Sequence, residues 1–149
     1  MQIKPKKSLG QNFLHDKNII EKIIDASNID NYDDVLEIGP GTGNLTRNII
    51  NQKPKKLYVV EKDKLLAKNL ARRFPNKIEI LIKDILKIPE NFYNGKKFLI
   101  LGNLPYNIST KILSDLCLNK KLSVKKMILM FQKEVADRII AEVNSKEYS

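Results

Sequence analysis

The stretch Val35-Leu36-Glu37-Ile38-Gly39-Pro40-Gly41-Thr42-Gly43 decides the fold. An apolar run ends in three glycines spaced two apart and leads into an amphipathic segment at 44–50, which predicts a strand, a tight turn and a helix. Glycine permits positive φ and close approach of a ligand, and the N–H groups that begin a helix attract anionic groups. The dinucleotide fingerprint G-x-G-x-x-G needs glycine at position 44, where this chain has Asn44. The stretch therefore predicts a site for a nucleotide-like cofactor other than NAD.

Polar residues follow three further apolar runs. The runs at 56–60, 78–83 and 98–102 are followed by Glu61, Asp84 and Asn103, respectively. The carboxyl ends of parallel strands meet at one edge of an open α/β sheet, where such sheets bind ligands. A carboxylate about twenty residues after the glycine turn can accept hydrogen bonds from ribose hydroxyls, so Glu61 indicates a ribose.

Helical patterns alternate with these runs. Asp16 can cap a helix with apolar positions at a 3.6-residue period, and Asp63 can cap another that Pro75 ends. A helix is expected from about Ser109 to Leu118, then a strand at 127–131. A last helix is expected to carry Val135, Ile139, Ile140 and Val143. The order predicts βαβ units with right-handed crossovers, and hence a largely parallel sheet with helices on both faces.

Composition predicts one domain without a membrane segment. The chain has 149 residues, is 42% hydrophobic, and contains no apolar run long enough to cross a bilayer. Its basic beginning has no apolar segment behind it, so we expect no secretory signal and a cytoplasmic location. The net charge of +10 favours a polyanionic partner such as nucleic acid.

Single residues exclude other chemistry. Cys117 is the only cysteine, so no disulfide within the chain can form, and its place in an expected helix predicts a buried, inert thiol. His15 is the only histidine and has no cysteine or second histidine to share a metal, so we expect no metal site and a surface or capping role for it.

Two longer motifs, Gly10-Gln11-Asn12-Phe13-Leu14 and Asn103-Leu104-Pro105-Tyr106-Asn107-Ile108-Ser109-Thr110, add specificity to this pattern. With the glycine turn, Glu61, Asp84 and residues 132–138, they resemble S-adenosylmethionine-dependent methyltransferases, and among these the small-subunit ribosomal RNA adenine dimethyltransferases of the KsgA type. The resemblance implies a Rossmann-like class I methyltransferase fold and S-adenosylmethionine as cofactor. It also implies dimethylation of the exocyclic N6 amine of adenines in 16S ribosomal RNA, linked to ribosome biogenesis.

The resemblance also implies roles for individual residues. The expected cofactor contacts are Asn12, Leu14, Gly39, Gly41, Glu61, Asp84 and Asn103. The side-chain carbonyl of Asn103 and the backbone carbonyl of Leu104 would accept the hydrogens of the target amine. Pro105 would stiffen the loop, and Tyr106 would stack on the flipped base. The expected RNA contacts are Lys4, Lys6 and Lys7.

Two alternative functions share parts of these motifs. Large-subunit ribosomal RNA adenine methyltransferases that confer erythromycin-type resistance share much of the motif at 103–110. Relatives of this fold also serve as ribosome-assembly or transcription factors for which methylation is dispensable. The stretch at 132–138 is more similar to the small-subunit enzymes, so we favour that function.

Members of the resembled family continue with two more strands and a helical domain. The resemblance therefore implies that residues 1–149 are a catalytic domain that is incomplete at its C-terminus. The strand at 127–131 would then have one unpaired edge, which is a template for association. We expect the 149-residue chain to bind S-adenosylmethionine weakly or not at all and not to methylate ribosomal RNA. We expect it to self-associate through that edge or through the apolar face at Val135, Ile139 and Ile140.

Overall fold

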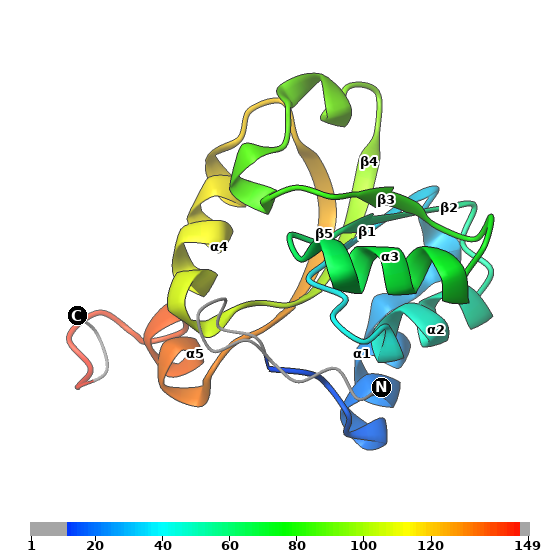
Figure 1. Cartoon of the computed structure of the whole chain (residues 1–149). Coiled ribbons are helices and arrows are strands. Elements are labelled where there is room, and N and C mark those ends of the chain that lie inside the picture. Colours follow the sequence, from blue (N-terminus) through cyan, green and yellow to red (C-terminus); the bar gives the residue numbers. More distant parts are fainter. Residues whose placement is uncertain (1–11, 147–149) are drawn as a thin grey trace.

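The computed structural model describes residues 12–146, which form a five-stranded sheet (Figure 1). The strands are β1 (Asp34–Ile38), β2 (Lys56–Val60), β3 (Glu79–Leu81), β4 (Lys97–Asn103) and β5 (Ser123–Met130). They lie in the order β3-β2-β1-β4-β5, and every neighbouring pair is parallel. β2 and β3 lie on one side of β1, and β4 and β5 lie on the other, so the strand order switches between β1 and β4, where open parallel sheets bind their ligands. The predicted parallel α/β fold is confirmed.

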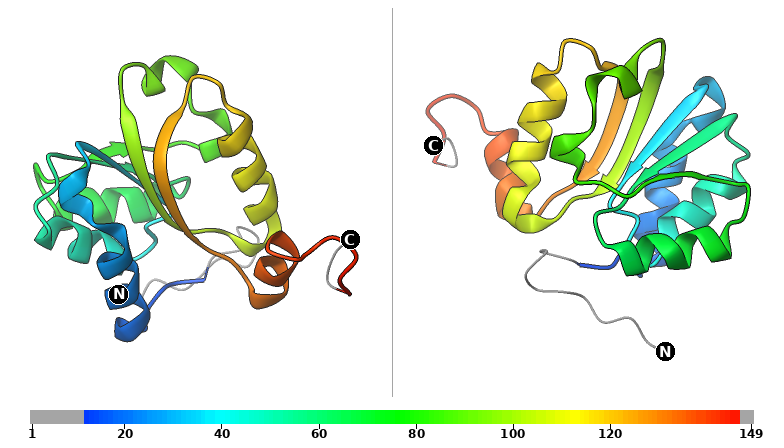
Figure 2. Two further views of the ribbon diagram at one scale, coloured as in Figure 1. Left: turned by 180° about the vertical axis from the view of Figure 1, so that it is seen from behind. Right: turned by 45° about the horizontal axis from the view of Figure 1, so that its top comes forward.

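Helices cover both faces of this sheet (Figure 2). The helices are α1 (Lys17–Ser27), α2 (Asn44–Asn51), α3 (Lys64–Arg73), α4 (Ser109–Leu118) and α5 (Lys133–Ile139). Asp16 caps α1, because its carboxylate accepts hydrogen bonds from the N–H groups of Asn18 and Ile19 at 2.9 and 3.2 Å. Asp63 caps α3 in the same way, with a 2.8 Å bond from Leu65. Both predicted caps are confirmed.

The core has two halves, one on each side of the sheet. On one side, Val35 and Leu99 pack with residues of α1, α2 and α3. On the other side, Leu36 and Ile100 pack with Ile112 of α4. Because both faces are covered, β1 and β4 are nearly continuous apolar runs instead of alternating ones. This explains why the sequence signal for these two strands is strong.

The structure corrects several predicted boundaries. Strand β3 covers only three residues, and the chain from it to β4 forms short 3-10 turns at Ile85–Lys87 and Glu90–Tyr93. Strand β5 begins at Ser123, earlier than predicted, and is irregular between Phe98 and Leu99 of its partner. The last helix ends at Ile139, so it does not carry Ile140 or Val143 as predicted.

Cys117 is exposed, so the predicted buried thiol is wrong. Its helix α4 buries Ile112 and Leu116, which are spaced four residues apart on one face. Position 117 is turned about 100° from Leu116 around the helix and therefore faces solvent. Within residues 12–146, none of the helices combines the length and the apolar character that a bilayer span requires.

Candidate functional site

The glycine turn after β1 has the backbone conformation that only glycine adopts easily. Gly39, Gly41 and Gly43 have φ angles of +66°, +57° and +80°. The surrounding atoms also leave no room for a side chain at Gly43, because a Cβ there would lie 2.6 Å from Cδ2 of Leu70. A Cβ on Gly39 would lie 3.3 Å from the backbone oxygen of Asn103. The turn therefore brings bare backbone to the carboxyl ends of β1 and β4.

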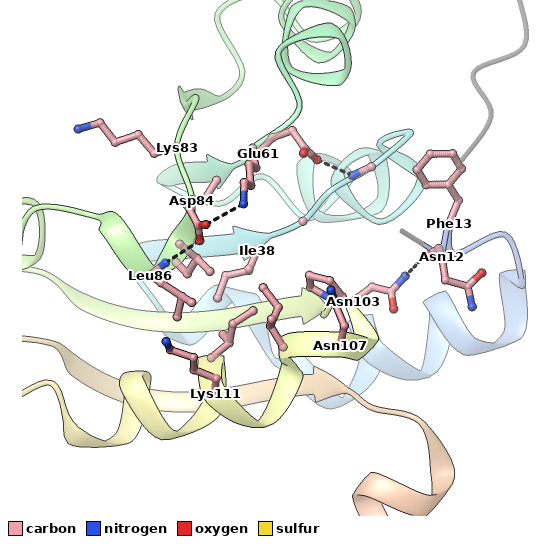
Figure 3. A pocket seen from close by; sticks show the side chains of 18 residues that line it. Asn12, Phe13, Ile38, Glu61, Lys83, Asp84, Leu86, Asn103, Asn107 and Lys111 are labelled. Carbon is pink, nitrogen blue, oxygen red and sulfur yellow. Dashed lines mark hydrogen bonds and ion pairs between the residues drawn. The ribbon is translucent and has the colours of Figure 1, made fainter. Parts of the chain in front are cut away.

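Glu61 fixes this turn to the end of β2. Its Oε2 accepts a 3.3 Å hydrogen bond from the N–H of Gly41, and its Oε1 accepts a 2.8 Å bond from the N–H of Asp63. Burial raises the pKa of Glu61, while these N–H donors act in the opposite direction. The side chain is only 6% exposed and lies against the same cavity as the turn (Figure 3).

Asp84 follows β3 and begins the next 3-10 turn. Its Oδ1 accepts a 3.1 Å hydrogen bond from the N–H of Leu86, and its Oδ2 pairs with Nζ of Lys62 at 2.9 Å. Partial burial works to raise the pKa of Asp84, but the Lys62 and Leu86 hydrogen bonds outweigh it and lower this pKa below its ordinary value. Asp84 is thus a second carboxylate at the carboxyl edge of the sheet. It follows β3, which pairs with β2 on the side away from β1.

The segment at 12–14 is fastened across the end of β4. The side-chain amide of Asn103 donates a 2.5 Å hydrogen bond to the backbone oxygen of Asn12 (Figure 3). The Asn12 side-chain amide donates to the hydroxyl of Tyr106. The Phe13 ring covers Gly41, where a Cβ would be 2.8 Å from ring atom Cδ1. The backbone oxygen of Leu14 accepts a 2.8 Å bond from the Asn44 side chain. Two motifs that are about ninety residues apart in sequence are therefore joined directly.

These parts surround one cavity of about 270 Å³. Seven residues singled out from the sequence line it: Asn12, Gly39, Gly41, Glu61, Asp84, Asn103 and Pro105. Leu14 lines a smaller cavity next to it, whereas Leu104 is buried in the core beside the sheet. Tyr106 is half-buried and reaches the site through its contact with Asn12. Lys4, Lys6, Lys7, Gly10 and Gln11 lie outside the described residues.

No site role was predicted from the sequence for the other residues that line the cavity: Phe13, Ile38, Val60, Lys62, Lys83, Ile85, Leu86, Asn107, Ile108, Lys111 and Ile112. Four of these stand in the quoted motifs, namely Phe13, Ile38, Asn107 and Ile108. Lys62 and Lys83 are sequence neighbours of Glu61 and Asp84, so adjacency to a predicted site residue could have found them. Lys111 is reached through α4, which passes beneath the cavity (Figure 3). Its position depends on tertiary packing, and no local pattern indicates it.

Within the described part of the chain, no group of three His, Cys, Asp or Glu side chains is placed to hold a metal ion. His15 is exposed and lies 3.2 Å from the Asn44 side chain, measured from its Nδ1. This position agrees with the surface role expected for it.

A family model and the curated relatives of this chain indicate the same family. The family model described as ribosomal RNA adenine dimethylase matches residues 2–149. A relative from Pelagibacter ubique named ribosomal RNA small subunit methyltransferase A is 54% identical over 150 residues, which is 99% of this chain and 57% of the relative.

Two solved structures are also similar. The dimethyladenosine transferase from Plasmodium falciparum has a TM-score of 0.79 at 33% identity, over 93% of this chain and 50% of that one. The 23S rRNA methyltransferase ErmE has a TM-score of 0.72 at 30% identity, over 85% and 50%. The chain thus spans little more than half the length of such relatives. Because the family model matches residues 2–149 of its 149 residues, the chain belongs to the ribosomal RNA adenine dimethylase family.

Proposed function

We propose that this chain forms the S-adenosylmethionine-binding catalytic domain of an enzyme that dimethylates N6 of adenines in small-subunit ribosomal RNA in the cytoplasm. The observation that carries the proposal is the hydrogen bonding of Asn12 to Asn103 and Tyr106, with Asn12 and Asn103 lining one cavity together with the glycine turn. Family membership and the name of the Pelagibacter ubique relative support the choice of small-subunit RNA. The weaker likeness to ErmE supports large-subunit RNA as the alternative substrate.

The residues present fit the proposed cofactor. The backbone at Gly39 and Gly41 has no Cβ that would keep a ligand away, and Phe13 covers the turn. Glu61 and Asp84 supply carboxylate oxygens after the adjacent strands β2 and β3. Glu61 would accept a hydrogen bond from a ribose hydroxyl, and Asp84 would accept one from the adenine amine. All these residues belong to the described chain, so we propose that the chain itself binds S-adenosylmethionine, in place of the weak or absent binding expected from the sequence. When bound, S-adenosylmethionine supplies an electrophilic methyl group.

Asn103 and Leu104 would orient the target amine. Because Nδ2 of Asn103 donates to the Asn12 backbone oxygen, Oδ1 of Asn103 remains to accept a hydrogen from the substrate. The Leu104 backbone oxygen would accept the other hydrogen, which turns the nitrogen lone pair out of conjugation with the adenine ring. The dipoles of the two carbonyl groups would also stabilise the positive charge that grows on nitrogen. Pro105 restricts the backbone at φ −62°, and Tyr106 would stack on the flipped base.

Basic residues near the cavity would hold the RNA backbone. Lys62, Lys83 and Lys111 line the cavity, and all three are exposed. We propose that they and Lys4, Lys6 and Lys7, which precede the segment at 12–14 in the sequence, contact phosphates.

A Glu61→Ala substitution tests the cofactor site. We expect it to weaken S-adenosylmethionine binding by roughly 1.5–3 kcal/mol, the range for a hydrogen bond to a charged group. Isothermal titration calorimetry of the chain measures this, with Glu79→Gln on the exposed side of β3 as a control that leaves affinity unchanged. Unchanged affinity in Glu61→Ala, or tighter binding of NAD than of S-adenosylmethionine, would rule out the assignment.

We also propose that the chain associates with itself. Strand β5 lies at the edge of the described sheet, and Ile139, Ile140 and Val143 near it in sequence are 44%, 78% and 69% exposed. An open strand edge with apolar neighbours favours pairing between copies. Sedimentation velocity should show a mass that rises with concentration and falls in Ile140→Lys, whereas Leu118→Lys on α4 should behave like wild type. A chain that is monomeric at all concentrations would refute the proposal.

A further inference from the structure

Glu37 is a buried acid that the proposed mechanism does not use. It lies in β1 with its side chain on the side of the sheet that α2 covers, and it is 1% exposed. Neither of its carboxyl oxygens has a hydrogen-bond partner among residues 12–146, and the same is true of the nearby Thr46 hydroxyl. An unpaired charge in such a place is costly, so the carboxyl group is stable there only when neutral or when a cation comes close.

A small cavity of about 20 Å³ is lined by Glu37 and by residues that also line the main pocket. That volume is enough for one water molecule. The residues that line both cavities are Asn12, Phe13, Gly39, Gly41 and Asn103. Glu37 therefore lies one layer behind the glycine turn, on the far side of the turn from the proposed ligand.

No positively charged side chain among the described residues lines the small cavity beside Glu37. Glu61, the other acid at the turn, lies close enough to disfavour a second negative charge. Arg73 is engaged with the backbone oxygen of Thr42, and exposed His15 contacts Asn44. Burial raises the pKa of Glu37 to about 8, and Glu61 adds to this. The hydroxyl and the backbone N–H of Thr46 lie near enough to oppose the rise, although neither is placed to donate a hydrogen bond to the carboxyl oxygens.

We infer, on the basis of the proposed function, that Glu37 is a proton-linked positioning residue: it is neutral in the free protein and releases its proton when a cationic ligand enters the pocket. The proton passes to solvent, and the carboxylate that remains attracts the positive charge in front of the turn. S-adenosylmethionine carries a sulfonium, whereas S-adenosylhomocysteine carries a neutral thioether and is otherwise alike. Glu37 thus favours the methyl donor over the product that must leave.

Proton release can be measured without any turnover. Calorimetry in two buffers of different ionisation enthalpy counts the protons released on binding, and carbon-13 NMR of the labelled carboxyl groups follows Glu37 in the free chain. We expect S-adenosylmethionine to release about half a proton to one proton per ligand near neutral pH, and S-adenosylhomocysteine to release clearly less. Between about pH 6.5 and about pH 8.5, affinity for S-adenosylmethionine should rise roughly fivefold to tenfold more in wild type than in Glu37→Gln.

The outcomes separate this inference from the proposed function. Glu21→Gln, on the exposed side of α1, controls for a general loss of charge and should match wild type. Binding with equal proton release for both ligands, or with the same pH dependence in Glu37→Gln, would overturn the inference and leave the proposed function standing. A Glu37 carboxyl that titrates at the pH of surface glutamates would also overturn it. A chain that binds neither ligand at any pH would overturn the proposed function and the coupling together.

Discussion

An Asn103→Ala substitution is expected to lower methyl transfer to adenine by at least about 100-fold, because the substrate amine loses the acceptor that orients its lone pair. Affinity for S-adenosylmethionine should stay within a few fold, since Glu61, Asp84 and the glycine turn are unchanged. Transfer is measured with a fusion of this chain to the C-terminal part of the Pelagibacter ubique relative, because this chain spans 57% of that relative. Labelled methyl incorporation into small-subunit RNA gives the rate.

Three further variants show whether the loss is specific. Asn107→Ala also lines the cavity but is not expected to face the amine, so it should keep most of the activity. Tyr106→Ala should cost roughly 1–3 kcal/mol of base stacking, whereas Tyr106→Phe should be mild. Normal turnover by Asn103→Ala would refute its role in positioning the amine.

A Glu37→Gln substitution is expected to remove a large pH dependence of stability. The pKa of Glu37 is raised from 4.5 to about 8 in the folded chain, so the folded state binds more protons than the unfolded state between these values. The free energy of unfolding of the wild type should therefore fall by about 3–5 kcal/mol as pH rises through this window. The unfolded chain loses the Glu37 proton at a lower pH than the folded chain, which must either hold the proton or bury a charge. In Glu37→Gln this component is absent.

Urea denaturation of the unliganded chain at several pH values measures the effect. The comparison uses the slope with pH, because a buried glutamine amide adds a cost of its own that does not vary with pH. The difference in unfolding free energy between Glu37→Gln and wild type should grow in favour of the variant from about pH 4.5 to about pH 8. Parallel stability curves for the two proteins would contradict the neutral state of Glu37.

The sequence predicts the parts of the fold that rest on continuous apolar runs. β1, β2, β4 and the whole of α4 agree with prediction, because these segments are buried on both sides of the sheet or have clear ends. The beginning of β5 was missed because Lys125 and Lys126 interrupt the apolar pattern. There, pairing with β4 imposes the strand, and Val124 and Lys126 face Phe98 and Leu99 across an irregular register. Tertiary pairing overrides the local preference at that edge.

The site was predictable to a different degree. The placement of Glu61, Asp84 and Asn103 at one edge follows from the predicted parallel sheet, because the carboxyl ends of parallel strands lie together. The order of the strands comes from the structure. The contact of Asn12 with Asn103 and Tyr106 does not, because it joins a loop to a strand end about ninety residues away. The buried position of Glu37 follows from its place in β1, but its lack of partners depends on the packing of α2.

Nucleoside analysis of methylated RNA tests the proposed function most directly. The fusion protein is incubated with S-adenosylmethionine and with unmodified small-subunit and large-subunit ribosomal RNA in separate reactions, and the digested nucleosides are identified by mass spectrometry. We predict N6,N6-dimethyladenosine from small-subunit RNA and none above background from large-subunit RNA. Dimethyladenosine from large-subunit RNA alone, or no methylated adenosine from either RNA by a folded, cofactor-binding protein, would contradict the proposal.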